Sequence, residues 1–412
     1  MKILMVNKFL YPRGGAETYM LQIGEYLQSQ KHEVEYFGMR DRQNIVGNRL
    51  GLETAPMDFR SHGLGRVLYP FRVLYSLEAK RKIRRVIRQF SPDVIHLNNI
   101  YYHLTPSIID AAAEMGIPVI ETEHDSHLVC PNHMLLNIWT MTPCTRCVEG
   151  SIWNCAKRRC IHGSYIKSLL GSLEGSLYRH KRTYSKLRLL ICPSRFMEEM
   201  LKRDPRFRGK TVILQNFIRP EPWVDVEKGD YVLYFGRLSE EKGIDRLLDA
   251  CRLAPEIPFV IAGRGPLAHL LEEDCPSNVT YVGFQEGPAL TELIRRARFS
   301  VCLPICYENC PLSVLESLSL GTPVLANRIG GVPELIRDGE TGVLLDRFTP
   351  EEYALQISGL YHDRERLAKL WKNCKERTDF VTLDEYCGRL LELYRSVVEE
   401  GALCETDCTG NT

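Results

Sequence analysis

The chain has 412 residues, 44% of them hydrophobic and 25% charged. This composition is typical of a globular protein, and the length exceeds one ordinary core, so two domains are expected. The formal net charge of +1 at pH 7 gives no electrostatic indication of a nucleic acid partner. The apolar start at 1–7 is too short for a signal peptide, and no run reaches the length of a membrane span. We therefore expect a cytoplasmic protein.

The first half of the chain alternates short apolar runs with amphipathic segments. An apolar run at 3–6 leads through a glycine-containing turn into a helix predicted over about 16–28. Further strands are predicted at 34–37, 94–97, 119–121 and 189–192. Strands alternating with helical stretches form a βαβ series, which predicts a parallel sheet.

The same alternation restarts near residue 230. Strands are predicted at 231–235, 259–262, 279–282, 300–303, 323–325 and 343–345. The polar run 225–230 has the composition of a linker. We predict an N-terminal α/β domain over 1–220, on which a helix at about 384–399 packs back, and a second α/β domain over 221–383. Ligands bind at the carboxyl ends of such sheets, so a cleft between the domains is the predicted site.

Two glutamates flank a predicted helix start in the second domain. Glu308 lies in the loop before the helix, and Glu316 lies within it. Pro311 suits the first helical position, so the backbone N–H groups of Leu312 and Ser313 are free to bind a phosphate. Carboxylates beside a phosphate site are favourable when they accept hydrogen bonds from sugar or ribose hydroxyls.

A second motif supplies the cations. Gly236 ends a predicted strand and lets a ligand approach the backbone. Gly263, followed by Gly265, is either a plain tight turn or a further substrate-binding position. Arg237 can hold two phosphate oxygens at once, and Lys242 adds a point charge. Together with the helix start, these residues predict a nucleoside diphosphate site.

These motifs resemble the donor half of GT-B glycosyltransferases of the retaining family 4 (group 1) type. Glu308 and Glu316 match the family's E-x7-E pattern, and the run from Gly236 to Gly243 matches G-R-x4-K-G. The resemblance covers most of 230–350. It implies two Rossmann-like domains, with the first glutamate on the donor sugar, the second on the ribose, and Arg237 and Lys242 on the diphosphate.

The N-terminal half carries fewer signals. Gly14 and Gly15 follow the first strand, either as a tight turn or as an opening for donor phosphate or acceptor. A dinucleotide fingerprint, G-x-G-x-x-G, is absent from this turn, which argues against a dehydrogenase. His124 ends another strand, and the resemblance implies that it contacts the donor sugar near the reacting carbon. Asn216 matches a family position at the interdomain hinge and is a predicted substrate-binding residue.

A cysteine-rich insertion at about 130–163 stands apart from these motifs. Four cysteines follow a spacing typical of tetrahedral zinc: Cys144, Cys147, Cys155 and Cys160. Cys130 and His133 lie nearby. The sequence is consistent with a structural zinc that staples the insertion, and equally with reduced thiols that bind no metal. Because four protein ligands would fill such a site, it would leave no position open for chemistry.

Two basic segments lie in the N-terminal domain, at 80–88 and 179–188. Basic helices can dock on an anionic membrane surface, where lipid-linked acceptors reside, or they can be solvated helix faces. The sequence does not decide between these two interpretations.

The resulting hypothesis is a retaining transferase that moves a sugar from a nucleoside diphosphate sugar to a glycan or lipid-linked acceptor in surface polysaccharide biosynthesis. UDP is the base that the family uses most. The expected catalytic residues are His124, Arg237, Lys242 and Glu308. No paired-aspartate metal motif stands beside the phosphate site, so we expect transfer without a metal cofactor. A GT-B nucleotide-sugar epimerase and a non-catalytic nucleotide-sugar-binding component of a polysaccharide assembly complex are the alternatives.

Overall fold

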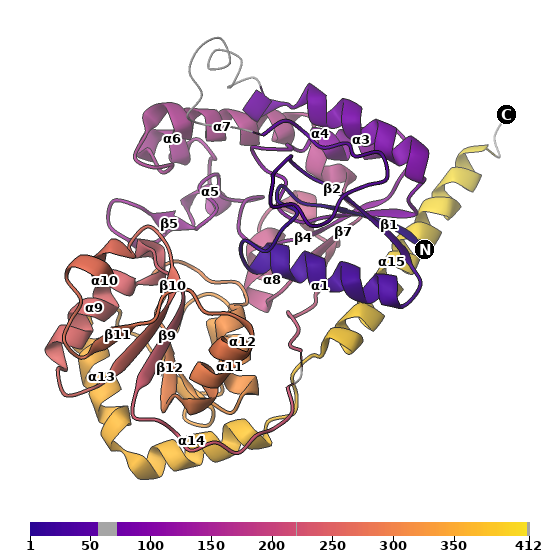
Figure 1. The fold of residues 1–412 in the computed structure, drawn as a ribbon. Helices are drawn as coiled ribbons and strands as arrows, with labels where there is room; N and C mark the ends of the chain where they lie inside the picture. The colour runs from indigo at the N-terminus through magenta and orange to yellow at the C-terminus, as the bar shows by residue number, and fades with distance from the viewer. Residues whose placement is uncertain (57–71, 220, 410–412) are drawn as a thin grey trace. The chain divides into compact units, whose positions relative to one another are not determined.

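The alternation of strands and helices produces two parallel sheets (Figure 1). The structure is a computed structural model, which describes residues 1–56, 72–219 and 221–409. Unit 1 comprises Met1–Ile138, Cys144–Gln215 and Leu383–Thr412, and unit 2 comprises Trp139–Pro143 and Asn216–Thr382. Pro220, the last residue of the predicted N-terminal domain, lies outside the described residues.

The sheet of unit 1 has the strand order β2-β1-β3-β4-β7-β8, with all neighbouring strands parallel. Its strands are β1 (Lys2–Val6), β2 (Glu33–Phe37), β3 (Val94–Leu97), β4 (Val119–Thr122), β7 (Leu189–Cys192) and β8 (Thr211–Ile213). Five of these were predicted, and β8, whose three residues are all only partly buried, was missed. The helices of this unit are α1 (Gly15–Ser29), α3 (Leu77–Phe90), α4 (Ser107–Ala113), α7 (Tyr165–His180), α8 (Arg195–Lys202) and α15 (Leu383–Thr409).

The predicted cysteine-rich insertion contains only short elements. They are β5 (Leu136–Asn137), β6 (Thr142–Pro143), α5 (Arg146–Glu149) and α6 (Asn154–Arg158). Helix α6 packs against α7, and Ser172 on α7 joins the two through its hydroxyl, which accepts from the Ala156 N–H at 3.2 Å.

The sheet of unit 2 has the strand order β11-β10-β9-β12-β13-β14, again parallel throughout. Its strands are β9 (Val232–Arg237), β10 (Phe259–Arg264), β11 (Val279–Tyr281), β12 (Phe299–Cys302), β13 (Val324–Asn327) and β14 (Gly342–Leu345). All six were predicted from apolar runs. The helices are α9 (Ile244–Leu253), α10 (His269–Glu273), α11 (Gly287–Arg296), α12 (Leu312–Ser319), α13 (Pro350–His362) and α14 (Arg364–Glu376).

The strand order identifies where each sheet can bind a ligand. In unit 2 the chain winds outward from β9 to β11 and then returns to the other side of β9 with β12. The carboxyl ends of β9 and β12 therefore flank the point where the winding reverses, which is where open α/β sheets bind ligands. In unit 1 the same reversal lies between β1 and β3.

Candidate active site

Two glycines face each other at the carboxyl ends of β9 and β10 in unit 2. Gly236 pairs with Gly263 in the strand register. A Cβ on Gly263 would lie 1.9 Å from the carbonyl oxygen of Gly236, and the φ of Gly263, 155°, disfavours any other residue. Beside Gly236 the nearest atom to a Cβ would be the Tyr234 hydroxyl at 3.9 Å. Gly263 is therefore required by backbone packing. Gly236, with a φ of 147°, is favoured by its backbone conformation alone and leaves open space at the strand end.

Lys242 and Glu308 meet at the point where the sheet reverses. Lys242 Nζ donates to Glu308 Oε1 in a hydrogen-bonded ion pair. Burial acts to lower the pKa of Lys242, but Glu308 and the Cys306 thiol outweigh it and hold the pKa above its usual value. The Lys242 side chain keeps 34% of its surface exposed, so a charged ammonium remains within reach of a ligand.

Arg237 is the second cation predicted at this site. It is solvent-exposed at the end of β9, and its carbonyl accepts a hydrogen bond from the Tyr234 hydroxyl at 2.8 Å. Among the described residues, no carboxylate pairs with its guanidinium. The guanidinium is therefore available to bind an anion in a bidentate manner.

The loop that carries Glu308 is fixed by backbone contacts. The Gly331 N–H donates to the Glu308 carbonyl at 2.8 Å, and a Cβ on Gly330 would lie 2.1 Å from the same oxygen. Asn216 Nδ2 donates to the Cys310 carbonyl at 3.1 Å. Asn216, at the first position of unit 2 after Gln215, thus anchors the segment that leads into α12.

Helix α12 begins at Leu312, one residue later than predicted, with Pro311 in an extended conformation as its N-cap. No side chain caps this end, so the first N–H groups, those of Leu312 and Ser313, remain available to an anion. Glu316 lies on the exposed side of the helix. Surrounding protein nevertheless desolvates its carboxyl group and raises its pKa to about 7.

His124 lies directly after β4 in unit 1. Its Nε2 donates to Asn98 Oδ1 at 2.8 Å, and its ring packs edge-on against Tyr19 with 4.8 Å between the ring centroids. Burial lowers the pKa of His124 to about 4, which Asp125 only partly opposes. The imidazole is therefore neutral at pH 7. Because Nε2 carries the proton that is donated to Asn98, Nδ1 has a free lone pair and can accept a hydrogen bond.

A chain of buried hydroxyls and a second imidazole supports the His124 turn. The Tyr19 hydroxyl lies 3.0 Å from Thr122 Oγ1 and 2.5 Å from the Tyr386 hydroxyl. His96 lies 2.8 Å from Thr122 Oγ1 and 2.7 Å from the Tyr394 hydroxyl. No sequence pattern indicated this network, because its members come from β3, β4, α1 and α15 and match no local motif.

The turn at Gly14 and Gly15 is exposed, and Gly14 is the N-cap of α1. The φ of Gly14 is −162°, an extended conformation that any residue adopts. A Cβ there would lie 3.4 Å from Glu17 Oε2. Glu17 in turn accepts from Asn7 Nδ2 at 3.1 Å, at the end of β1. Backbone strain therefore does not explain Gly14, and ligand approach stays a prediction.

Sequence reasoning also missed a buried acidic group at the end of β4. Glu121, Glu123 and His127 have potential ligand atoms within 4.8 Å of one another. Burial raises the pKa of Glu121 to about 8 and, with the Glu121 charge, raises the pKa of Glu123 well above its usual value. Neutral carboxyl groups are therefore favoured at pH 7. The i, i+2 spacing of the two glutamates on a strand was the available signal.

The two basic segments are partly neutralised within unit 1. On α3, Lys80 and Arg84 both pair with Glu114. In the second segment, Lys181 and Lys186 pair with the buried Asp110 at 2.8 and 2.5 Å. The exposed basic residues of α3 are Arg81, Arg85 and Arg88. Within the described part of the chain, no helix is long and apolar enough to cross a membrane.

Two family models match the chain. The model described as Glycosyltransferase Family 4 matches residues 13–222, and the model described as Glycosyl transferases group 1 matches residues 218–377.

Curated relatives carry related names. The chain is 26% identical over 222 residues to an uncharacterized glycosyltransferase of Methanocaldococcus jannaschii, covering 52% of this chain and 61% of that protein. It is 33% identical over 150 residues to an alpha-D-kanosaminyltransferase of Streptomyces kanamyceticus, covering 34% of this chain and 39% of that one. These matches span less than two thirds of the relatives' own lengths.

Solved structures share the fold. A sucrose-phosphate synthase of Thermosynechococcus elongatus has a TM-score of 0.71 at 16% identity, covering 97% of this chain and 99% of that chain. The Anabaena HepE protein in complex with UDP has a TM-score of 0.67 at 16% identity, covering 96% and 100%. With the two parallel sheets, these likenesses confirm the predicted two-domain α/β GT-B fold.

Proposed function

The chain belongs to the glycosyltransferases of group 1 and family 4, and on this basis we propose that it transfers a sugar from a nucleoside diphosphate sugar. The donor is a UDP-sugar, and the acceptor is a glycan or a lipid-linked glycan of a surface polysaccharide. Transfer retains the anomeric configuration. The UDP complexes of the Anabaena neighbour support the choice of donor.

One observation carries the proposal. In unit 2 the Lys242–Glu308 pair lies where the strand order reverses, and the unpaired Arg237 lies beside it at the end of β9. A diphosphate leaving group develops negative charge as the glycosidic bond breaks. Preorganised cations and N–H groups stabilise such charge without reorganising during the reaction. Arg237, Lys242 and the start of α12 supply these groups.

The remaining residues have complementary roles in this proposal. Glu308, held by Lys242, accepts hydrogen bonds from donor sugar hydroxyls, and Glu316 accepts from the ribose. His124 is neutral, so it supports the reacting face of the sugar through hydrogen bonding and not through a positive charge. Gly14 and Gly15 leave room for phosphate or acceptor. The phosphate needs no divalent cation, because protein cations take its place.

We further propose that the chain works at the inner face of the membrane, with Arg81, Arg85 and Arg88 on α3 as the contact. Outward arginines of this kind bind anionic lipid headgroups, each contributing about 1 kcal/mol at low salt. Replacing all three by glutamine should abolish sedimentation with vesicles that contain phosphatidylglycerol. Unchanged sedimentation of the triple variant would leave α3 as a solvated face.

A nucleotide-release assay tests the activity. The full chain is incubated with UDP-, GDP- and ADP-sugars, and the released nucleotide is measured with and without a crude glycan acceptor. Arg237→Ala and Lys242→Ala should each lower kcat by roughly 10²-fold or more with the preferred donor, because each removes a preorganised donor of hydrogen bonds to the leaving group.

The matched control is Arg252→Ala, which removes a cation of α9 that pairs with Asp249 and Asp274 on the surface. This variant should turn over normally. Near-normal turnover of Arg237→Ala and Lys242→Ala would contradict the proposed site. Accumulation of an epimerised donor without transfer would identify an epimerase instead.

A further inference from the structure

Four buried cysteines gather in the insertion of unit 1, although they come from separate parts of its backbone. Cys130 precedes β5, Cys147 lies in α5, Cys155 lies in α6, and Cys160 lies in the turn after α6. Cys147, Cys155 and Cys160 pack together as a small cluster against Ile161. All four are free thiols.

Burial separates these four thiols from Cys144, the fifth cysteine of the insertion. Cys130, Cys147, Cys155 and Cys160 are each at most 9% exposed. Cys144 is half-buried. Burial therefore favours Cys130 over Cys144 as the fourth thiol beside the packed cluster.

The backbone after α6 brings two of these thiols together. The Cys160 N–H donates to the Cys155 carbonyl at 3.1 Å, and the Arg159 N–H donates to the Ala156 carbonyl at 3.2 Å. Arg159 between them is left-handed, with a φ of 51°. These bonds form a Schellman motif. In this motif the two positions that Cys155 and Cys160 occupy usually make an apolar contact. Here that contact is between two sulfur atoms.

The insertion contains little regular secondary structure of its own. Its helices α5 and α6 have four and five residues. Five of the ten described non-glycine residues with positive φ lie between 130 and 163: His133, Leu135, Met141, Arg159 and His162. Each left-handed residue of this kind costs about 1 kcal/mol or more and persists only when its surroundings fix it. A cross-link through the thiol cluster would provide this constraint.

We infer that Cys130, Cys147, Cys155 and Cys160 bind one structural zinc ion as four thiolates. Four thiolates on short loops are the ligand set that zinc prefers, and binding energy of such sites goes into folding the segment that carries them. As free thiols the sulfur atoms do not yet lie within 4.8 Å of one another in a group of three. Binding would draw them onto Zn–S distances of about 2.3 Å.

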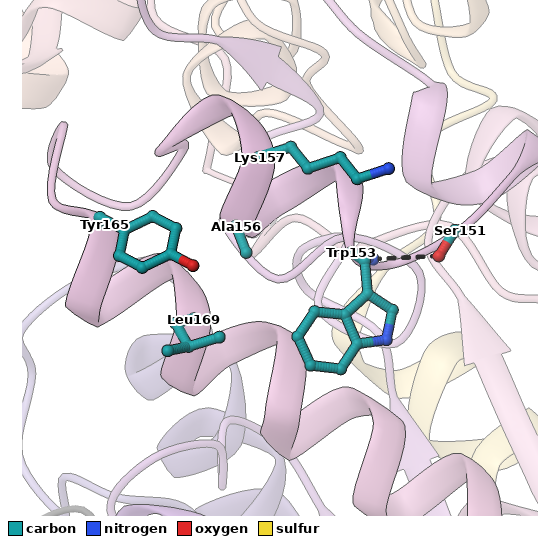
Figure 2. Close-up of a pocket in the computed structure, with 6 residues that line it drawn as sticks. All are labelled: Ser151, Trp153, Ala156, Lys157, Tyr165 and Leu169. Carbon is teal, nitrogen blue, oxygen red and sulfur yellow. Dashed lines mark hydrogen bonds between the residues drawn. The ribbon is translucent and has the colours of Figure 1, made fainter.

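The zinc centre would fix one wall of a surface pocket. A cavity of about 430 Å³ lies over α6 and α7, lined by Ser151, Trp153, Ala156, Lys157, Tyr165 and Leu169. Figure 2 shows Trp153, Tyr165 and Leu169 facing a common space. Cys155 lies between Trp153 and Ala156 in the chain, so a ligand bond at Cys155 would hold this wall. The zinc centre does not depend on the proposed sugar transfer.

Metal analysis of the full chain tests the inference. Protein produced in zinc-supplemented medium and purified without chelators should contain one zinc ion per chain by inductively coupled plasma mass spectrometry. Cys130→Ser, Cys147→Ser, Cys155→Ser and Cys160→Ser should each lose most of this zinc. Cys144→Ser, at the half-buried fifth cysteine, and Cys251→Ser, in the core of unit 2, are the matched controls and should retain it.

A second measurement tests the inference even if the cysteine variants fail to fold, because it uses the unaltered chain. Replacing zinc by cobalt in the unaltered chain should give the charge-transfer and ligand-field absorption of a tetrahedral thiolate centre. Absence of both bound zinc and this spectrum would overturn the inference. Zinc loss in Cys144→Ser but not in Cys155→Ser would overturn the ligand set. A disulfide between Cys155 and Cys160, found by peptide mass spectrometry without reduction, would overturn the metal site.

Discussion

The two units hold their predicted functional groups in opposite ways. In unit 2 the groups are charged and accessible: Arg237 is unpaired among the described residues, and Lys242 keeps its charge beside Glu308. In unit 1 His124 is neutral and is supported by a buried network of hydroxyls and a second imidazole, although the neighbouring Asp125 is charged. A charged leaving group needs the first environment. The second environment suits orientation of a neutral sugar, because neutral groups can be buried if they are hydrogen-bonded.

His124 tests whether the neutral environment contributes to chemistry. His124→Ala should lower kcat about 10²-fold, comparable to the loss of one preorganised donor, with a smaller change in donor affinity. Turnover with the preferred donor and donor affinity by calorimetry would be measured together. Tyr19→Phe keeps the ring against His124 but removes the hydroxyl, and it should have the milder effect. Near-normal kcat in His124→Ala would confine catalysis to the groups of unit 2.

The glycines of the two units should respond differently to substitution. Gly263→Ala forces a Cβ against the Gly236 carbonyl and should destabilise the chain by about 2–4 kcal/mol. Gly14→Ala should cost less than about 1 kcal/mol, because its backbone is extended. Gly359→Ala, in an open position on α13, is the control. Urea unfolding measures all three, and equal losses at positions 263 and 14 would contradict the distinction.

Buried Glu174 makes the stability of unit 1 fall as pH rises from mildly acidic to about 8. Burial raises its pKa to about 8, and Tyr102, Tyr178 and Tyr184 lie close enough to sense its charge. The pKa of Glu174 is higher in the folded than in the unfolded chain, so protonation of its carboxyl group stabilises the fold. This stabilisation is complete below about pH 4.5 and is lost as pH rises through 8. Glu174→Gln should therefore be more stable than the unaltered chain at pH 8, by up to about 4 kcal/mol.

At pH 5 the same variant should differ little from the unaltered chain, because both then carry a neutral side chain at position 174. Thermal unfolding followed at the two pH values gives the comparison. A variant that is equally stabilised at both pH values would show that packing, and not ionisation, is responsible.

Glu316 should give the smallest effect of the charged groups. Its exposed carboxylate is proposed to accept a hydrogen bond from the ribose, so Glu316→Gln should weaken UDP binding about tenfold, which corresponds to about 1.4 kcal/mol. Calorimetric titration with UDP measures it. Because surrounding protein partly desolvates the Glu316 carboxyl group and raises its pKa to about 7, the difference should shrink below that pH. Unchanged affinity at pH 8 would exclude the ribose role.

The sequence by itself determined the parallel sheets and the donor motifs. Apolar runs predicted five strands of unit 1 and all six of unit 2, because buried parallel strands need continuous apolar residues. The donor residues could be predicted because charge, glycine and a helix start recur at fixed local spacing. Gly236 lies at the end of β9, Lys242 and Glu308 lie in the segments after β9 and β12, and parallel topology brings the ends of adjacent strands together.

Only the tertiary structure decided which groups are partners. Nothing local joins His96 to Tyr394, Tyr19 to Tyr386 or His124 to Asn98, since their contacts form when distant segments pack. The same holds for the cysteines: spacing selected Cys144, whereas folding placed Cys130 among the buried thiols. Local patterns encode elements and their exposed ends, but burial, and with it the pKa of each group, depends on contacts between elements.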